Sequence, residues 1–238
     1  VIVTLGDDTS VRRRPGLALD KSAISVGQRV EILGTITSAP SAEATTLDAT
    51  AGRVRLLVTQ LAGLVSASNP GQLNVDLASI DRRPAGLFDF SGTGLSPAVD
   101  ADPSDYEVAT GQLPLADVAT GDAVRLSGFV QPFGAAPEDF NAFTVVGLTT
   151  RGARLALGWR PEGTTAPFLA LGSDGIVPDL ANPAIGARHV ILVGGVPVDL
   201  LDLPAAPTLV PPASGPTRYA ILAGPRVLGF PDFASLAT

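Results

Sequence analysis

The sequence predicts an all-β protein, and three observations support this fold class. Short apolar segments alternate with a period of two, the pattern of strands with one buried face. The 238 residues include 26 Gly and 21 Pro, which separate these segments at close intervals. No long stretch shows the amphipathic period of a helix. Many short strands divided by turn residues are typical of all-β domains.

One strand pattern occurs twice, with an offset of 94 residues between its first glycines at 27 and 121. Residues 27–36 have the sequence GQRVEILGTI, and residues 121–130 have the sequence GDAVRLSGFV. Alternation places one set of side chains from each copy on the inner face: Val30, Ile32, Gly34 and Ile36, and then Val124, Leu126, Gly128 and Val130. Glycine inside a strand often marks a bulge or a close backbone approach, as small barrels require.

This pattern resembles the first strand of OB-like barrels. Residues 27–150 resemble a family of exported bacterial β-barrel domains of unknown function, with residues 74–77 and 86–92 as later strand segments. The resemblance implies tandem OB-like small β-barrels with a Pro/Gly-rich β C-terminal portion. It brings no catalytic residues. Residues 92–105, rich in Gly, Ser, Pro and Asp, are the expected linker and divide the chain into a first OB-like unit, residues 1–100, and a second OB-like unit with a β-rich extension, residues 101–238.

The remaining elements follow in chain order. Residues 1–5 are expected to form a strand, and residues 46–50 and 53–59 a hairpin around Ala51 and Gly52. Residues 60–66 are expected to form a helical turn, residues 69–71 a tight turn, and residues 92–105 a linker. The later strand predictions are residues 140–148, 154–159, 168–171, 189–193, 196–201, 219–222 and 227–228. A proline-rich connector covers residues 204–216.

Composition limits the classes of function and favours an exported protein. The chain has 16 Lys+Arg against 23 Asp+Glu, which argues against nucleic acid binding because phosphate neutralisation needs cations. The basic run at residues 12–14 is interpreted as a solvated segment. There are no Cys and no Met, which excludes disulfides and suits an oxidising location. We expect a mature chain in the periplasm, secreted or at the cell surface, without a transmembrane segment.

Motifs for chemistry are missing from the sequence. His189 is the single histidine, at the head of an apolar segment, and is interpreted as structural or surface-exposed. Asp100, Asp102 and Asp105 form a weak calcium candidate that lacks the glycine and closing glutamate of an EF-hand. Nothing in the sequence brings Asp76, Asp81 and Asp89 together as an acid/base pair. The chain is therefore expected to be no enzyme and to need no cofactor.

Aromatic residues are the remaining binding candidates, since OB folds use exposed rings as stacking platforms. The candidates are Phe88, Phe90, Phe129, Phe133, Phe140, Phe143 and the lone Trp159. Phe88 and Phe90 share one face, which favours core positions. For Trp159, core and contact positions remain open.

The expected function is a non-catalytic structural or interaction role as an exported protein, such as a subunit of an extracellular or cell-surface assembly. The alternative is a binding module for an oligosaccharide or another extracellular polymer, and a metal-assisted hydrolase ranks third. We expect contacts with a protein partner, or between copies, to use residues 1–5 or the segments after Pro216 as strand edges.

Overall fold

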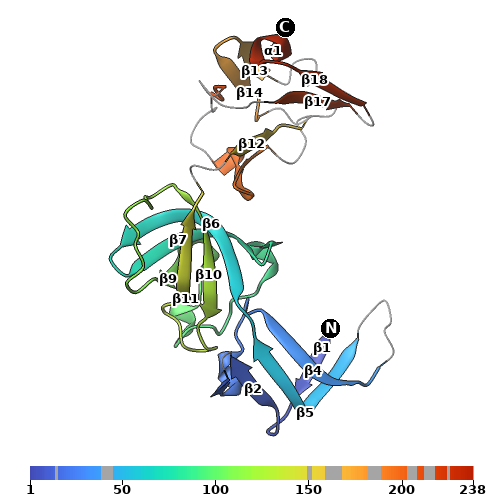
Figure 1. The fold of residues 1–238 in the computed structure, drawn as a ribbon, viewed down its shortest axis with the longest axis vertical. Helices are drawn as coiled ribbons and strands as arrows, with labels where there is room; N and C mark the ends of the chain where they lie inside the picture. Colours follow the sequence, from blue (N-terminus) through green and yellow to red (C-terminus); the bar gives the residue numbers. More distant parts are fainter. Residues whose placement is uncertain are drawn as a thin grey trace. The chain divides into compact units, whose positions relative to one another are not determined.

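The computed structural model describes residues 1–13, 16–38, 45–148, 152–158, 168–181, 189–202, 208–211, 218–223 and 226–237 (Figure 1). The chain forms two compact units: Val1–Gly152 with Val193–Val196, and Ala153–Leu192 with Pro197–Thr238. The division predicted at residues 100 and 101 falls inside the first unit instead. Ala101 lies in the core of that unit, and the Asp100 carboxylate accepts a backbone N–H from Gly94.

A long strand organises the first sheet. β5 (Thr46–Leu56) pairs antiparallel with β4 (Val30–Ile36), and its other side pairs in parallel with β1 (Ile2–Leu5) and β2 (Ser10–Arg13). β3 (Leu17–Leu19) pairs with β2, and the short 3-10 helix η1 (Lys21–Ala23) follows. The hydrophobic cluster packed against this sheet contains the buried side chains of Val11, Ala23, Val54 and Leu56.

Five further strands close into a barrel. They are β6 (Thr59–Asn69), β7 (Gln72–Ile80), β9 (Tyr106–Ala109), β11 (Phe140–Gly147) and β10 (Ala123–Val130), and β10 pairs back onto β6. The β9–β11 pair is parallel and the others are antiparallel. The two-residue β8 (Arg83–Pro84) pairs antiparallel with the end of β7. The fully buried side chains in the barrel include Leu61, Leu73, Ile80, Tyr106, Leu126 and Phe140.

Two local predictions in this region are wrong. Residues 46–56 form one continuous strand, β5, instead of the predicted hairpin. Gly52 lies within this strand, where a Cβ would collide with the Leu33 carbonyl oxygen. That close approach, and not a turn, requires glycine. Residues 60–66 belong to strand β6 instead of a helical turn, and Leu61, Gly63 and Val65 are all buried in strand alternation.

The loops between β8 and β10 contain 3-10 turns. Residues 86–92, expected as a strand, begin in η2 (Ala85–Leu87) and continue as a loop. The predicted linker contains η3 (Pro97–Val99) and η4 (Pro103–Asp105). The turn at residues 69–71 is confirmed as the β6–β7 connection, with Gly71 at φ +84°.

The two copies of the repeated pattern share local geometry but have different neighbours. Gly34 and Gly128 both lie at bulges, where a Cβ would meet the partner strand's carbonyl oxygen at 2.3 Å and 2.0 Å. The close approach expected for both glycines is confirmed. However, β4 pairs with β5 alone in the described sheet, whereas β10 lies between β6 and β11 in the barrel. The structure therefore does not confirm tandem barrels.

The C-terminal unit is also built from short strands. They are β12 (Ala153–Ala156), β13 (Phe168–Gly172), β14 (Gly175–Pro178), β15 (Val190–Val193), β16 (Val196–Asp199), β17 (Tyr219–Ala223) and β18 (Arg226–Phe230). They pair as β12-β15-β16, β13-β14 and β17-β18. η5 (Leu200–Asp202) and α1 (Phe233–Ala237) complete the elements of the described residues. The all-β prediction is confirmed.

Candidate functional site

In the acidic loop considered for calcium, each of the three carboxylates accepts hydrogen bonds from a different protein group. Asp100 accepts a backbone N–H at 2.8 Å, and Asp102 accepts the N–H and hydroxyl of Ser104 at 2.8 and 2.7 Å. Asp105 accepts from the Asn74 amide at 3.0 Å. Hydrogen bonds hold the pKa values of Asp100 and Asp102 below the usual range. Within the described residues, no three acidic or histidine side chains gather to hold a metal ion.

The other carboxylates considered for chemistry lie on separate elements. Asp76 is on β7, and Asp81 follows that strand and accepts the Gln60 N–H at 3.1 Å. Asp89 accepts from Ser91 in the loop after η2, and these hydrogen bonds lower its pKa. The structure therefore supports no acid/base pair among them.

His189 is buried, with 3% of its surface exposed. Neither ring nitrogen has a hydrogen-bond partner among the described residues. Burial lowers the pKa of His189, which favours the neutral imidazole. Trp159 lies outside the described residues.

The phenylalanines divide into core and surface groups. Phe90 and Phe140 are buried in the barrel, and Phe88 packs against that core. Phe133 and Phe143 are 47% and 50% exposed. The core position predicted for both Phe88 and Phe90 is confirmed for Phe90, whereas Phe88 is half-buried against the core.

One buried carboxylate lies beside the acidic loop. Asp139 is 4% exposed, and its Oδ2 accepts the Glu107 N–H at 2.9 Å. Burial, together with the charges of Glu107, Asp102 and Asp105, raises the pKa of Asp139 to about 6. Four carboxylates, those of Asp102, Asp105, Glu107 and Asp139, therefore interact with one another in this part of the barrel.

A buried polar cluster joins the first sheet to the barrel. Gln28 Oε1 accepts the Val130 N–H at 3.0 Å, and Gln28 Nε2 donates to the Leu57 carbonyl at 2.7 Å and to Thr59 Oγ1 at 3.2 Å. Thr59 Oγ1 also accepts the Arg29 N–H at 2.8 Å. These contacts fix the start of β4 against the start of β6 and the end of β10. Sequence reasoning missed Gln28, because a polar residue after a turn glycine gives no sign of burial.

A groove of about 390 Å³ opens beside this cluster. Its lining residues are Glu31, Arg55, Leu56, Leu57, Val58 and Phe129. The lining is mainly apolar, with an ion pair of 3.0 Å between Arg55 and Glu31. The Arg13 guanidinium carbon lies 4.8 Å from the centre of the Phe129 ring, a cation–π distance, and the Phe143 ring lies 6.1 Å from Phe129. An aromatic ring beside aliphatic and charged groups can contact both the apolar and the polar parts of a small ligand. The lining contains no nucleophile with a base beside it.

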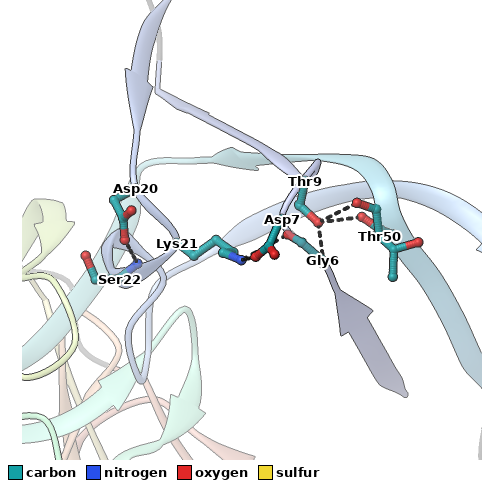
Figure 2. A network of polar contacts seen from close by, with 8 residues as sticks. Gly6, Asp7, Thr9, Asp20, Lys21, Ser22 and Thr50 are labelled. Carbon is teal, nitrogen blue, oxygen red and sulfur yellow. Dashed lines mark hydrogen bonds and ion pairs between the residues drawn. The ribbon is translucent and has the colours of Figure 1, made fainter.

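The first strand is anchored by a polar network at its end (Figure 2). Thr9 Oγ1 accepts the Gly6 N–H at 2.8 Å and donates to the Ala49 carbonyl at 2.7 Å. Lys21 pairs with Asp7 at 2.9 Å and holds the pKa of Asp7 below its usual value. These contacts tie the β1–β2 turn to β5 and to η1.

The strand itself presents apolar surface. Val1 and Ile2 are 90% and 61% exposed, and in the described structure β1 pairs on one side only. In the C-terminal unit, Leu222 and Val227 are directly paired across β17 and β18 and are 67% and 65% exposed. Both segments predicted as contact edges therefore carry exposed apolar side chains.

No described helix has the length and apolar character needed to cross a bilayer. Comparison with protein-family models, with curated proteins and with solved structures found no match for this chain. The geometry of the chain's own residues is therefore the basis for its functional assignment.

Proposed function

We propose that this chain is a non-catalytic, exported interaction protein that joins an extracellular assembly through exposed strand edges. The observation that carries the proposal is β1, which pairs on one side only within the described residues and carries exposed apolar side chains. The absence of Cys and Met supports an oxidising location. An unpaired edge favours association by strand addition, because backbone N–H and C=O groups find partners in a neighbouring chain.

The backbone direction of β1 identifies the residue that a partner strand would meet. Ile2 N–H donates to the Thr45 carbonyl and therefore points toward β5. Because N–H groups alternate in direction along a strand, the Val3 N–H points toward the open edge. Proline at Val3 removes this outward donor and leaves the Ile2 bond in place.

The test compares Val3→Pro with Val3→Thr. Light scattering measures the average mass of each variant, and a pull-down measures its binding to cell-surface proteins of the organism that makes it. Val3→Thr keeps the N–H group and the preference for strand geometry, so it is the matched control. We expect Val3→Pro to lower the average mass or to lose the bound partner, while Val3→Thr retains both. Far-UV circular dichroism checks that both variants remain folded. Equal association by the two variants would contradict edge pairing at β1.

A second function is favoured by the groove at Phe129. An aromatic ring next to the planar side chains of Arg55 and Glu31 is suited to the apolar faces and hydroxyls of a sugar. We propose oligosaccharide binding there as the alternative. A thermal-shift screen with neutral and acidic oligosaccharides tests it, using Phe129→Leu against wild type. A ligand that raises the melting temperature of both proteins equally would bind elsewhere.

A further inference from the structure

Charge is unevenly divided along the first unit. Residues 59–148, which contain the barrel, have 3 Arg and no Lys against 11 Asp+Glu, a formal charge of −8. Residues 1–58 have 7 Lys+Arg against 6 Asp+Glu, a formal charge of +1. The chain's net charge of −7 is therefore concentrated on the barrel, and the first sheet is left slightly cationic.

The arginines of the first sheet gather on one face. Arg55 on β5 is in register with Arg12 on β2 and with Glu31 on β4, so these three side chains project from the same face. Arg53, two residues from Arg55 on the same strand, joins them. The opposite face carries the buried side chains of Val54 and its neighbours. The cationic group therefore lies on the solvent face of the sheet.

Two of these arginines lack an acidic partner. The described residues contain two ion pairs, Lys21 with Asp7 and Arg55 with Glu31. Arg12 is exposed and its Nε donates to the Ser10 hydroxyl at 3.0 Å, and Arg53 is exposed. Like charges on neighbouring strands repel, as Arg12 and Arg55 do here. An anionic group bound across them would remove this repulsion.

The barrel supplies matching anionic side chains. Asp102 and Asp105 are exposed beside half-buried Glu107, and none of the three has a cation partner among the described ion pairs. Burial is the largest cause of the raised pKa of nearby Asp139, and the charges of Glu107, Asp102 and Asp105 add to it. The two surfaces are complementary in charge, and Arg12, Arg53, Asp102 and Asp105 form no ion pair among the described residues.

We propose that the arginine face of one copy, formed by Arg12, Arg53 and Arg55, binds the acidic barrel surface of a second copy around Asp102 and Asp105. This rests on the proposed function and names its partner as a second copy of the chain. The contact joins two different surfaces and is therefore heterologous, so it leaves one surface of each kind free in a dimer and permits longer assemblies.

The experiment measures mass by light scattering across protein concentration in low and high salt. Exposed charges are largely screened over a Debye length, so wild type is expected to associate at about 20 mM salt and to dissociate at about 500 mM. The double variant Arg12→Gln/Arg53→Gln should weaken association by about tenfold or more, the effect of about 1.4 kcal/mol. Asp102→Asn/Asp105→Asn should do the same and keeps polar side chains for the local hydrogen bonds.

Mixing the two variants is the decisive measurement. Each double variant retains one intact surface, so each should be monomeric alone. Together they should form a one-to-one dimer that does not grow, because the remaining surfaces are both neutralised. Arg82→Gln/Arg83→Gln is the matched control: it removes two exposed positive charges from the β7–β8 turn and should associate like wild type.

Each contrary result has a distinct meaning. Unchanged association in both double variants, or a mixture that stays monomeric, overturns the charged contact. If Val3→Pro abolishes association while the arginine variant does not, the edge-pairing function stands and this inference fails. Monomeric wild type that binds a sulfated polysaccharide through Arg12 and Arg53 would assign the face to an acidic polymer instead. A wild type monomeric at low salt and indifferent to that polymer overturns the inference outright.

Discussion

Gln28 gives the sharpest prediction about what holds the first unit together. Gln28→Met keeps the side-chain volume and removes every hydrogen bond of the Gln28 side chain. The loss of stability therefore reports on these polar contacts, because no cavity is left. The Val130 N–H loses its partner in a buried position, and the Leu57 and Arg29 carbonyls lose donors at 2.7 and 2.8 Å. An unsatisfied buried N–H costs about 1–3 kcal/mol, and carbonyls that reach some water cost less, for a total of about 2–4 kcal/mol.

Amide hydrogen exchange measures this loss inside the barrel, independently of the C-terminal unit. Val124 and Leu126 are fully buried on β10 and should exchange at rates set by opening of the barrel. A loss of about 2–4 kcal/mol corresponds to exchange about 30- to 1,000-fold faster. Gln60→Met, at an exposed position on β6, should change these rates by less than about threefold.

A result below about fivefold for Gln28→Met would refute the reasoning, since it would mean that water satisfies the released groups. Gln28→Glu adds a second check. It places a carboxylate against two carbonyl oxygens, so burial and repulsion raise its folded pKa. Its stability should therefore be greatest below the unfolded pKa of about 4.3 and fall as pH rises through the folded value.

Three further predictions concern single positions. Gly128→Ala should lower the free energy of unfolding by about 2–4 kcal/mol, because the added Cβ would collide with the Asn141 carbonyl oxygen. Gly147→Ala is the control, since its Cβ would meet its nearest atom at 3.8 Å and the free energy of unfolding should hardly change. Urea denaturation of both variants measures the difference. Asp139 should titrate near pH 6 by carbon NMR. Because its folded pKa is raised, stability should fall by about 1–2 kcal/mol between pH 4 and 6, and Asp139→Asn should abolish this dependence. EDTA and calcium should leave the melting temperature unchanged, since the carboxylates at residues 100–105 already accept hydrogen bonds; a calcium-dependent rise would restore that loop as a metal site.

Local patterns in the sequence predicted strands well where alternation was strong. β10 and its buried positions Val124 and Leu126 followed from period two, and so did the close approach at Gly128. Residues 60–66, by contrast, have apolar side chains on both faces of β6, so their sequence shows no clear period of two. The alternation appears only in the structure, as burial of Leu61, Gly63 and Val65 on one face.

Local sequence patterns do not predict which distant strands pair with one another. The parallel β9–β11 pair and the return of β10 to β6 join segments distant in the sequence, and nothing near either segment encodes its partner. The same holds for the candidate sites. Gln28 is buried because β10 ends beside it, and the arginine face exists because β2 and β5 are in register. The two strand copies share their glycine spacing and alternation, but they pair with different neighbours, so the equivalence expected for them is not confirmed.

The parallel pairing of β1 and β2 with β5 has a consequence for the order of folding. Ile2 pairs with Thr46 and Ser10 pairs with Arg53, so these partners are 44 and 43 residues apart. At about 5–20 residues per second, a ribosome makes the partner of β1 about 2–9 s after β1 itself. The β6–β7 hairpin closes across a tight turn and needs no such delay. β1 and β2 wait for β5 with their apolar side chains uncovered, and a chaperone or a neighbouring chain has those seconds in which to bind them.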